Sequence, residues 1–138
     1  MAVDTRAPDA VTVGSERVLR AVENLTRTQI VQYAGAADDY NPLHTDEVYA
    51  REVAGAPTVF AHGMLSMALT GRLLAEWFGN ERVVSFAVRF KKQVWPGDDL
   101  TVTGRVTSIE DGIAEVALST VNQGGVEVVA GSAKVRLP

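Results

Sequence analysis

Residues 63–78 have the sequence GMLSMALTGRLLAEWF, and residues 84–90 have the sequence VSFAVRF. The first run predicts a helix that begins at Gly63 and ends near Phe78, with Gly79-Asn80 as its stop signal. Because its first two turns are nearly apolar on all sides, we expect other parts of the fold to surround this helix. In the second run every other residue is large and apolar, which predicts a strand with one buried face.

Period-two patterns continue downstream, separated by the hairpin signals Asp111-Gly112 and Gly124-Gly125. These patterns and the strand at 84–90 predict a four-strand antiparallel meander. Upstream, a short strand precedes a helix capped by Thr26, and Pro42 forces the residues around it into an ordered turn. The predicted spans are 100–110, 113–123 and 126–137 for the downstream strands, 17–22 for the upstream strand, 26–34 for the helix, 38–44 for the turn and 46–49 for a single helical turn capped by Asp46.

A sheet of this length, joined by tight turns and accompanied by one buried helix, is expected to curl around that helix. The prediction is therefore an α+β fold of the hot-dog type, an antiparallel sheet wrapped around one long central helix. A small open barrel and a cystatin-like wrap would give a similar pattern. The chain of 138 residues is expected to be a single domain, 1–138, with residues 1–12 as a flexible N-terminus.

Composition narrows the functional classes. Hydrophobic residues make up 46% of the chain and charged residues 22%, a balance that excludes a disordered chain. The net charge of −4 argues against binding to nucleic acid. There is no cysteine, which removes disulfides and thiolate chemistry and fits a cytoplasmic location. Residues 53–71 lack charge but include Pro57 and three glycines, so we expect a buried segment and no membrane span.

Two loop features point to chemistry. Asp39 and His44 are five residues apart across the predicted turn, which allows a carboxylate and an imidazole to converge, as general acid–base catalysis requires. A helix cap and a solvated histidine would leave the same pattern. Gly63 begins the buried helix, where free backbone N–H groups favour a developing oxyanion. A glycine that only permits tight packing at the start of the helix is the alternative.

Three blocks of sequence together resemble the MaoC-like, R-specific enoyl-CoA hydratase family. They are YAGAADDYNPLH at 33–44, FAHGM at 60–64 and VRFKKQVWPGD at 88–98. The family signature has Ser-Gly-Asp-x-Asn-Pro-x-His, then Ala-His-Gly, then an Arg-Phe strand ending in Pro-Gly-Asp. The blocks occur in the same order over nearly the whole chain, and the family fold is a single hot-dog, as the patterns predict. One departure is Ala37-Asp38, where the family has Ser-Gly, so the backbone of this turn is expected to differ locally.

The resemblance implies a catalytic role for Asp39 and His44, with the Gly63 N–H on the thioester carbonyl. Residues expected to contact the substrate or adjoin the dyad are Asn41, His62, Arg89 and Lys91. The implied reaction is reversible syn addition of water to a trans-2-enoyl thioester, giving a 3-hydroxyacyl thioester. No cofactor is expected beyond the coenzyme A of the substrate. No metal site is expected either, although Asp39, His44, Asp46 and His62 are possible ligands, because their spacing matches no known metal pattern.

Arg89, Lys91 and Lys92 form a basic cluster that could meet coenzyme A or acyl carrier protein, or could be an ordinary solvated face. The sequence at 91–97 is similar to actinobacterial members acting on steroid side-chain enoyl-CoA esters. An unpaired sheet edge predicts a homodimer, or a heteromer with a second hot-dog chain. Two other functions stay open: a hot-dog thioesterase, and a non-catalytic partner subunit of a hydratase.

Overall fold

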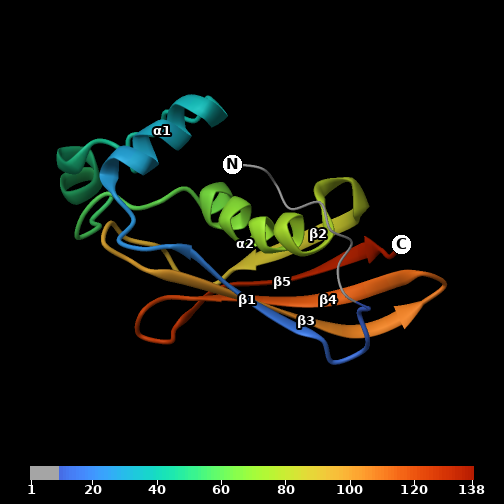
Figure 1. Ribbon diagram of the computed structural model, residues 1–138. Coiled ribbons are helices and arrows are strands. Elements are labelled where there is room, and N and C mark those ends of the chain that lie inside the picture. Colours follow the sequence, from blue (N-terminus) through green and yellow to red (C-terminus); the bar gives the residue numbers. More distant parts are fainter. Residues whose placement is uncertain (1–9) are drawn as a thin grey trace.

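Five strands form one antiparallel sheet, in a computed structural model that describes residues 10–138. One long helix, α2 (Gly63–Phe78), lies along one face of this sheet, whereas α1 (Arg27–Ala37) stands beyond the first turns of α2 (Figure 1). The other elements are β1 (Glu16–Val22), η1 (Tyr49–Val53), η2 (Asn80–Arg82), β2 (Val83–Phe90), β3 (Leu100–Glu110), β4 (Ile113–Val121) and β5 (Glu127–Arg136). The α+β class and the hot-dog arrangement are confirmed.

The strand order is β1-β3-β4-β5-β2, so the predicted four-strand meander is wrong in one respect. Tight hairpins do join β3, β4 and β5, but β2 pairs with β5 at the far edge. The turn at 96–99, between β2 and β3, makes backbone hydrogen bonds with Leu25. Leu25 N–H donates to Asp98 O at 2.9 Å, and Gly97 N–H donates to Leu25 O at 2.7 Å. The loop after β2 is therefore anchored to the turn after β1 and carries the chain across the sheet.

The buried face of β2 also differs from the simple alternation. Phe86 and Val88 are half-buried as predicted, but Val84 is 54% and Phe90 50% exposed. The β2–β5 register shifts between Val83 and Ser85, so Val84 lies at a bulge and Val83 packs on the core in its place. Phe90 lies at the end of the strand, where its ring covers the start of α2. Two large apolar side chains are consequently left open along the β2 edge.

Helix α2 is buried on the side that faces the sheet. Leu73, Leu74 and Trp77 pack against β3, β4 and β5 in the main core, and a Cβ at Gly104 would lie 2.7 Å from Leu73 Cδ2. The opposite side of the helix is open, with Met64 56% exposed. The expectation that α2 is surrounded is therefore wrong for the single chain, because the sheet covers only one side of it.

The N-terminal elements begin at the predicted caps, but α1 ends at Ala37, later than predicted, and the helical turn capped by Asp46 continues through η1 to Val53. Thr26 caps α1 through a capping box with Gln29, in which each side chain accepts from the other's backbone N–H. Of the expected flexible segment 1–12, residues 1–9 lie outside the described residues, whereas Val11 packs against the core. Within residues 10–138, no helix combines the length and the apolar character needed to cross a bilayer.

Candidate active site

The turn after α1 is held by its own polar groups. Asp39 N–H donates to Ala34 O at 3.0 Å, and Asn41 N–H donates to Asp39 Oδ1 at 3.2 Å. Leu43 N–H then donates to Asn41 Oδ1 at 3.0 Å, and His44 N–H to Asn41 O at 3.1 Å. These successive Asx-type bonds fix Asp39 and His44 on one tight loop, which confirms the predicted ordered turn. Asn41 acts within the turn through these bonds.

Asp38 occupies the position at which the family signature has glycine. Its φ of 55° and ψ of 35° are in the left-handed region, and its N–H donates to Ala34 O at the end of α1. Aspartate tolerates this conformation better than most residues, although less well than glycine. Asp38 thus has the left-handed conformation that glycine adopts without steric cost. It also introduces a second exposed carboxylate beside Asp39.

The His44 ring has a defined tautomer. Nδ1 lies 2.6 Å from Phe60 O, and since a carbonyl only accepts, Nδ1 carries the proton. Burial lowers the pKa of His44 below its ordinary 6.5; the Phe60 hydrogen bond and the Asp39 charge oppose this shift, and the His62 ring adds to it. The ring is consequently neutral near pH 7, with Nε2 unprotonated and able to accept a hydrogen bond or a proton.

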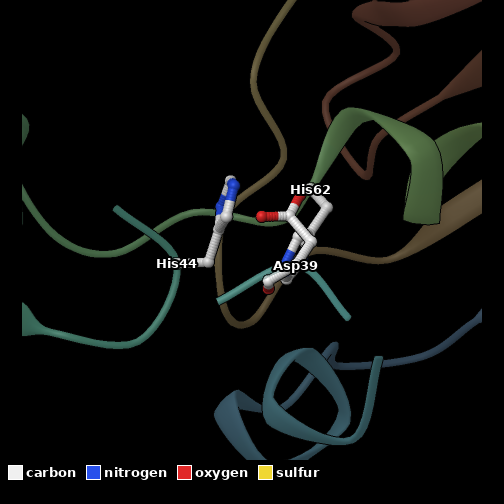
Figure 2. A group of neighbouring side chains, drawn as sticks. All are labelled: Asp39, His44 and His62. Carbon is white, nitrogen blue, oxygen red and sulfur yellow. The ribbon is translucent and has the colours of Figure 1, made fainter. Parts of the chain in front are cut away.

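His62 comes from the other side, as the residue that precedes α2. It is 2% exposed, and its Nε2 lies 3.1 Å from the backbone carbonyl of Asp39. Its ring stacks on that of His44, with centroids 3.8 Å apart and planes 28° from parallel. Figure 2 shows Asp39, His44 and His62 gathered where the turn after α1 meets the loop before α2.

One ligand atom from each of these three residues lies within 4.8 Å of the other two. His44 Nδ1 and His62 Nε2 are bound to carbonyl oxygens, so each ring has only its other nitrogen left as a ligand. The two rings are stacked with centroids 3.8 Å apart, so an ion in the plane of one ring would lie out of the plane of the other, which disfavours a shared ion. The donor set suits proton transfer better than metal binding.

The start of α2 supplies free donors beside these rings. Leu65 and Ser66 donate their N–H groups to His62 O, whereas within residues 10–138 the N–H groups of Gly63 and Met64 have no backbone acceptor. A Cβ on Gly63 would lie 3.3 Å from the Phe90 ring, so the glycine also permits close packing there. Free N–H groups at the start of a helix favour negative charge on an oxygen.

A cavity of about 460 Å³ opens at this point. Of the predicted site residues, His44, Gly63 and Lys91 line it, and Asp39 adjoins it through His44. His62 and Asn41 do not line it, and Arg89 faces a separate cavity beside Ala130 and Gly131. The remaining lining residues are Phe60, Ala61, Ser66, Phe90, Lys92, Gln93 and Val94. Ser66 was not predicted, although its position one helical turn after Gly63 is a signal that could have identified it.

The chain is similar to several known proteins. The family model described as MaoC like domain matches residues 3–128. The (R)-specific enoyl-CoA hydratase of Aeromonas caviae is 31% identical over 114 residues, covering 80% of this chain and 84% of that protein. The solved structure of the (R)-hydratase from A. caviae superposes with a TM-score of 0.83 at 28% identity, over 94% of this chain and 98% of that one. The 3-hydroxyacyl-thioester dehydratase Y of Mycobacterium tuberculosis is 34% identical over 105 residues, covering 67% of this chain and 36% of that protein.

Proposed function

Since the chain belongs to the MaoC-like domain family and is a hydratase/dehydratase of thioesters, we propose that its substrate is a trans-2-enoyl-CoA, hydrated reversibly to the (R)-3-hydroxyacyl-CoA. The observation that carries this proposal is the position of the His44 ring, whose Nδ1 is bound to Phe60 O and whose Nε2 is free beside Asp39. The free N–H of Gly63 lies on the same cavity.

In the proposed reaction one water lies between Asp39 and His44 and donates a hydrogen bond to each, because both groups are acceptors. The water oxygen bonds to the β-carbon while one of the two groups takes a proton from the water. A proton returns from the pair to the α-carbon on the same face, so the pair ends in its starting state. The negative charge that develops on the thioester oxygen is stabilised by the Gly63 N–H.

The charges around the cavity favour an anionic carrier of the acyl group, either coenzyme A or acyl carrier protein. Lys91 and Lys92 line the cavity and are exposed, although Lys91 Nζ also lies 3.4 Å from Glu127 Oε1. Exposed ammonium groups beside an opening attract the phosphates of coenzyme A and equally an acidic carrier protein. Arg89 lies with Lys91 along a second cavity beside β5, where it can contact the part of the carrier that extends beyond the first cavity.

The assembly is proposed to be a homodimer or a heteromer with a second hot-dog chain, formed along β2. This strand is an edge of the sheet, and Val84, Phe90 and Met64 are at least half exposed beside it. Open edges that carry large apolar groups are normally covered in native proteins. Size measurement of the purified chain, alone and with candidate partner chains, distinguishes the two assemblies.

The experiment follows the loss of enoyl-thioester absorbance with crotonyl-CoA, a long-chain enoyl-CoA and a steroid side-chain enoyl-CoA. Asp39→Asn is the test variant, and Asp38→Asn is its matched control, since it removes the neighbouring carboxylate and leaves the dyad intact. Hydration by the wild type and by Asp38→Asn, with loss in Asp39→Asn, supports the proposal, and the preferred substrate tests the steroid expectation. Release of free thiol would make the chain a thioesterase, and unchanged activity of Asp39→Asn within a complex would make it a non-catalytic partner.

A further inference from the structure

His62 is the one buried histidine of the chain. Hydrogen bonds of the first turn of α2 fix its backbone. It precedes α2, and its carbonyl accepts from the N–H groups of Leu65 and Ser66 at 3.1 and 3.3 Å. The first turn of the helix therefore determines where the ring points. Since the ring is 2% exposed and does not line the cavity, it does not contact a molecule bound there.

The side chain instead contacts both halves of the catalytic pair. Its Nε2 lies 3.1 Å from the backbone carbonyl of Asp39, which only accepts, so Nε2 is the protonated nitrogen. Its face stacks on His44 with ring centroids 3.8 Å apart, and Tyr33 of α1 contacts it in an edge-on arrangement with centroids 4.9 Å apart. One buried ring thus touches the main chain of Asp39, the imidazole of His44 and the end of α1.

A second feature is the other nitrogen of this ring. In the Nε2–H tautomer, Nδ1 is a buried lone pair with no partner among the described residues. The hydrogen bond to Asp39 O is therefore the one polar contact of the ring among these residues, and the stacking on His44 is its main apolar one.

We propose that His62 is the positioning residue of this site: its ring sets the Asp39 main chain and the His44 imidazole at a fixed separation, and it binds no substrate atom. The proposal assigns to His62 a role different from the substrate contact expected from the sequence. It rests on the proposed hydratase function, because positioning matters only if Asp39 and His44 share a water.

Two variants separate the parts of this role. His62→Phe keeps a flat ring that can stack on His44 and removes the donor to Asp39 O. His62→Gln keeps an N–H donor at a similar reach and removes the ring. We expect His62→Phe to lower kcat about 10- to 100-fold, the scale of a misplaced reacting group. KM should stay within about twofold of the wild-type value, since no substrate contact is lost. His62→Gln should recover most of the loss in kcat.

The same proteins give a readout that is independent of turnover, because the chain has only two histidines. Imidazole ¹⁵N NMR of the wild type should show His44 as the Nδ1–H tautomer and His62 as the Nε2–H tautomer. In His62→Phe the single remaining imidazole should titrate at a higher pH, because the neighbouring ring that lowers the His44 pKa is gone.

Several outcomes would overturn the proposal: the Nδ1–H tautomer at His62, a rise in KM at unchanged kcat, or wild-type kinetics in His62→Phe. A substrate-binding role predicts the second of these. Absence of hydration by the wild type, with both tautomers as expected, would instead remove the proposed function and leave the arrangement of the rings standing. Because the tautomers are measured in the wild type, the test survives a variant that fails to fold.

Discussion

The body of the molecule and its catalytic segment are built in opposite ways. The body, residues 63–136, consists of α2 and four strands held by apolar packing, with Leu73, Val102 and Val116 almost wholly buried. The catalytic segment, residues 38–62, contains one short helical turn and is held by hydrogen bonds and ion pairs. Arg27 pairs with Glu47 and donates to Thr58 Oγ1 at 2.9 Å, and Arg51 donates to Pro57 O at 2.9 Å.

Because of this difference, the residues that determine stability and the residues that determine catalysis lie in different regions of the chain. Removing a methylene from a packed core lowers the free energy of unfolding. Removing a donor or acceptor from a polar loop changes the positions of the side chains that the loop carries. Substitutions of core residues of the body that do not line the cavity should therefore change the free energy of unfolding with little effect on the turnover of the folded protein. Substitutions in the catalytic segment should do the reverse. The predictions below test this separation, starting with the largest expected effect.

The largest effect is expected for His44→Asn. The asparagine amide can still donate to Phe60 O from the place of Nδ1, but it offers no base in the place of Nε2. We expect kcat for enoyl-CoA hydration to fall by about 10²–10⁴-fold, the contribution of a general acid–base group. The unfolding free energy from urea denaturation should change by less than about 1 kcal/mol. Tyr40→Phe, in the same turn and 66% exposed, is the control and should retain activity.

The second effect is expected in the body, for Leu73→Ala. Leu73 is 1% exposed, in the main core with Trp77 and Val102. Its truncation should lower the unfolding free energy by about 2–5 kcal/mol, through lost burial and the remaining cavity. The kcat of the folded fraction should stay near the wild-type value. Val31→Ala, at a 54% exposed position of α1, should change stability by less than about 0.5 kcal/mol. A large loss of kcat in Leu73→Ala would contradict the separation of the two regions.

The two regions also differ in how much of them the sequence predicts. In the body, the bounds Gly63–Phe78 and Leu100–Glu110 are as predicted, since periodicity and turn residues are local signals. The place of β2 beside β5 was not predicted, because it depends on bonds between the turn at 96–99 and Leu25, which are far apart in sequence. The exposure of Val84 depends on a bulge that period-two alternation does not indicate.

In the catalytic segment, the residue types were predicted and their contacts were not. Asn-Pro indicated the turn that carries Asp39 and His44, and the turn is there. The stacking of His62 on His44 joins residues 18 positions apart through a loop without periodicity, so no pattern indicates it. The same holds for the His44–Phe60 bond that sets the tautomer. Residue roles that depend on such contacts, as for His62, need the structure.

The third prediction concerns pH. The His44 pKa is lowered in the folded protein, so the unfolded chain binds more protons below about pH 6.5 and the folded state loses stability as the pH falls through this range. At higher pH the ring is neutral in both states and this contribution vanishes. We expect the acid limb of kcat/KM to lie below pH 6.5, because the neutral ring is the active form. Urea midpoints between about pH 7.5 and 5.5 should fall less in His44→Asn than in the wild type.

The smallest effect is expected for Asp38→Gly, at the junction between α1 and the catalytic segment. Asp38 has a φ of 55°, which glycine adopts without the steric cost that a side chain adds, although the unfolded chain gains freedom. We expect a net gain in unfolding free energy of up to about 1 kcal/mol. Asp111→Gly is the matched control, since Asp111 has a φ of 51° at the β3–β4 hairpin, far along the sheet. Both variants should gain stability, measured by urea denaturation. The kcat of hydration should match the wild type in both variants, because Asp38 lies outside the proposed dyad. A change of kcat in Asp38→Gly alone would show that the carboxylate beside Asp39 takes part in the chemistry.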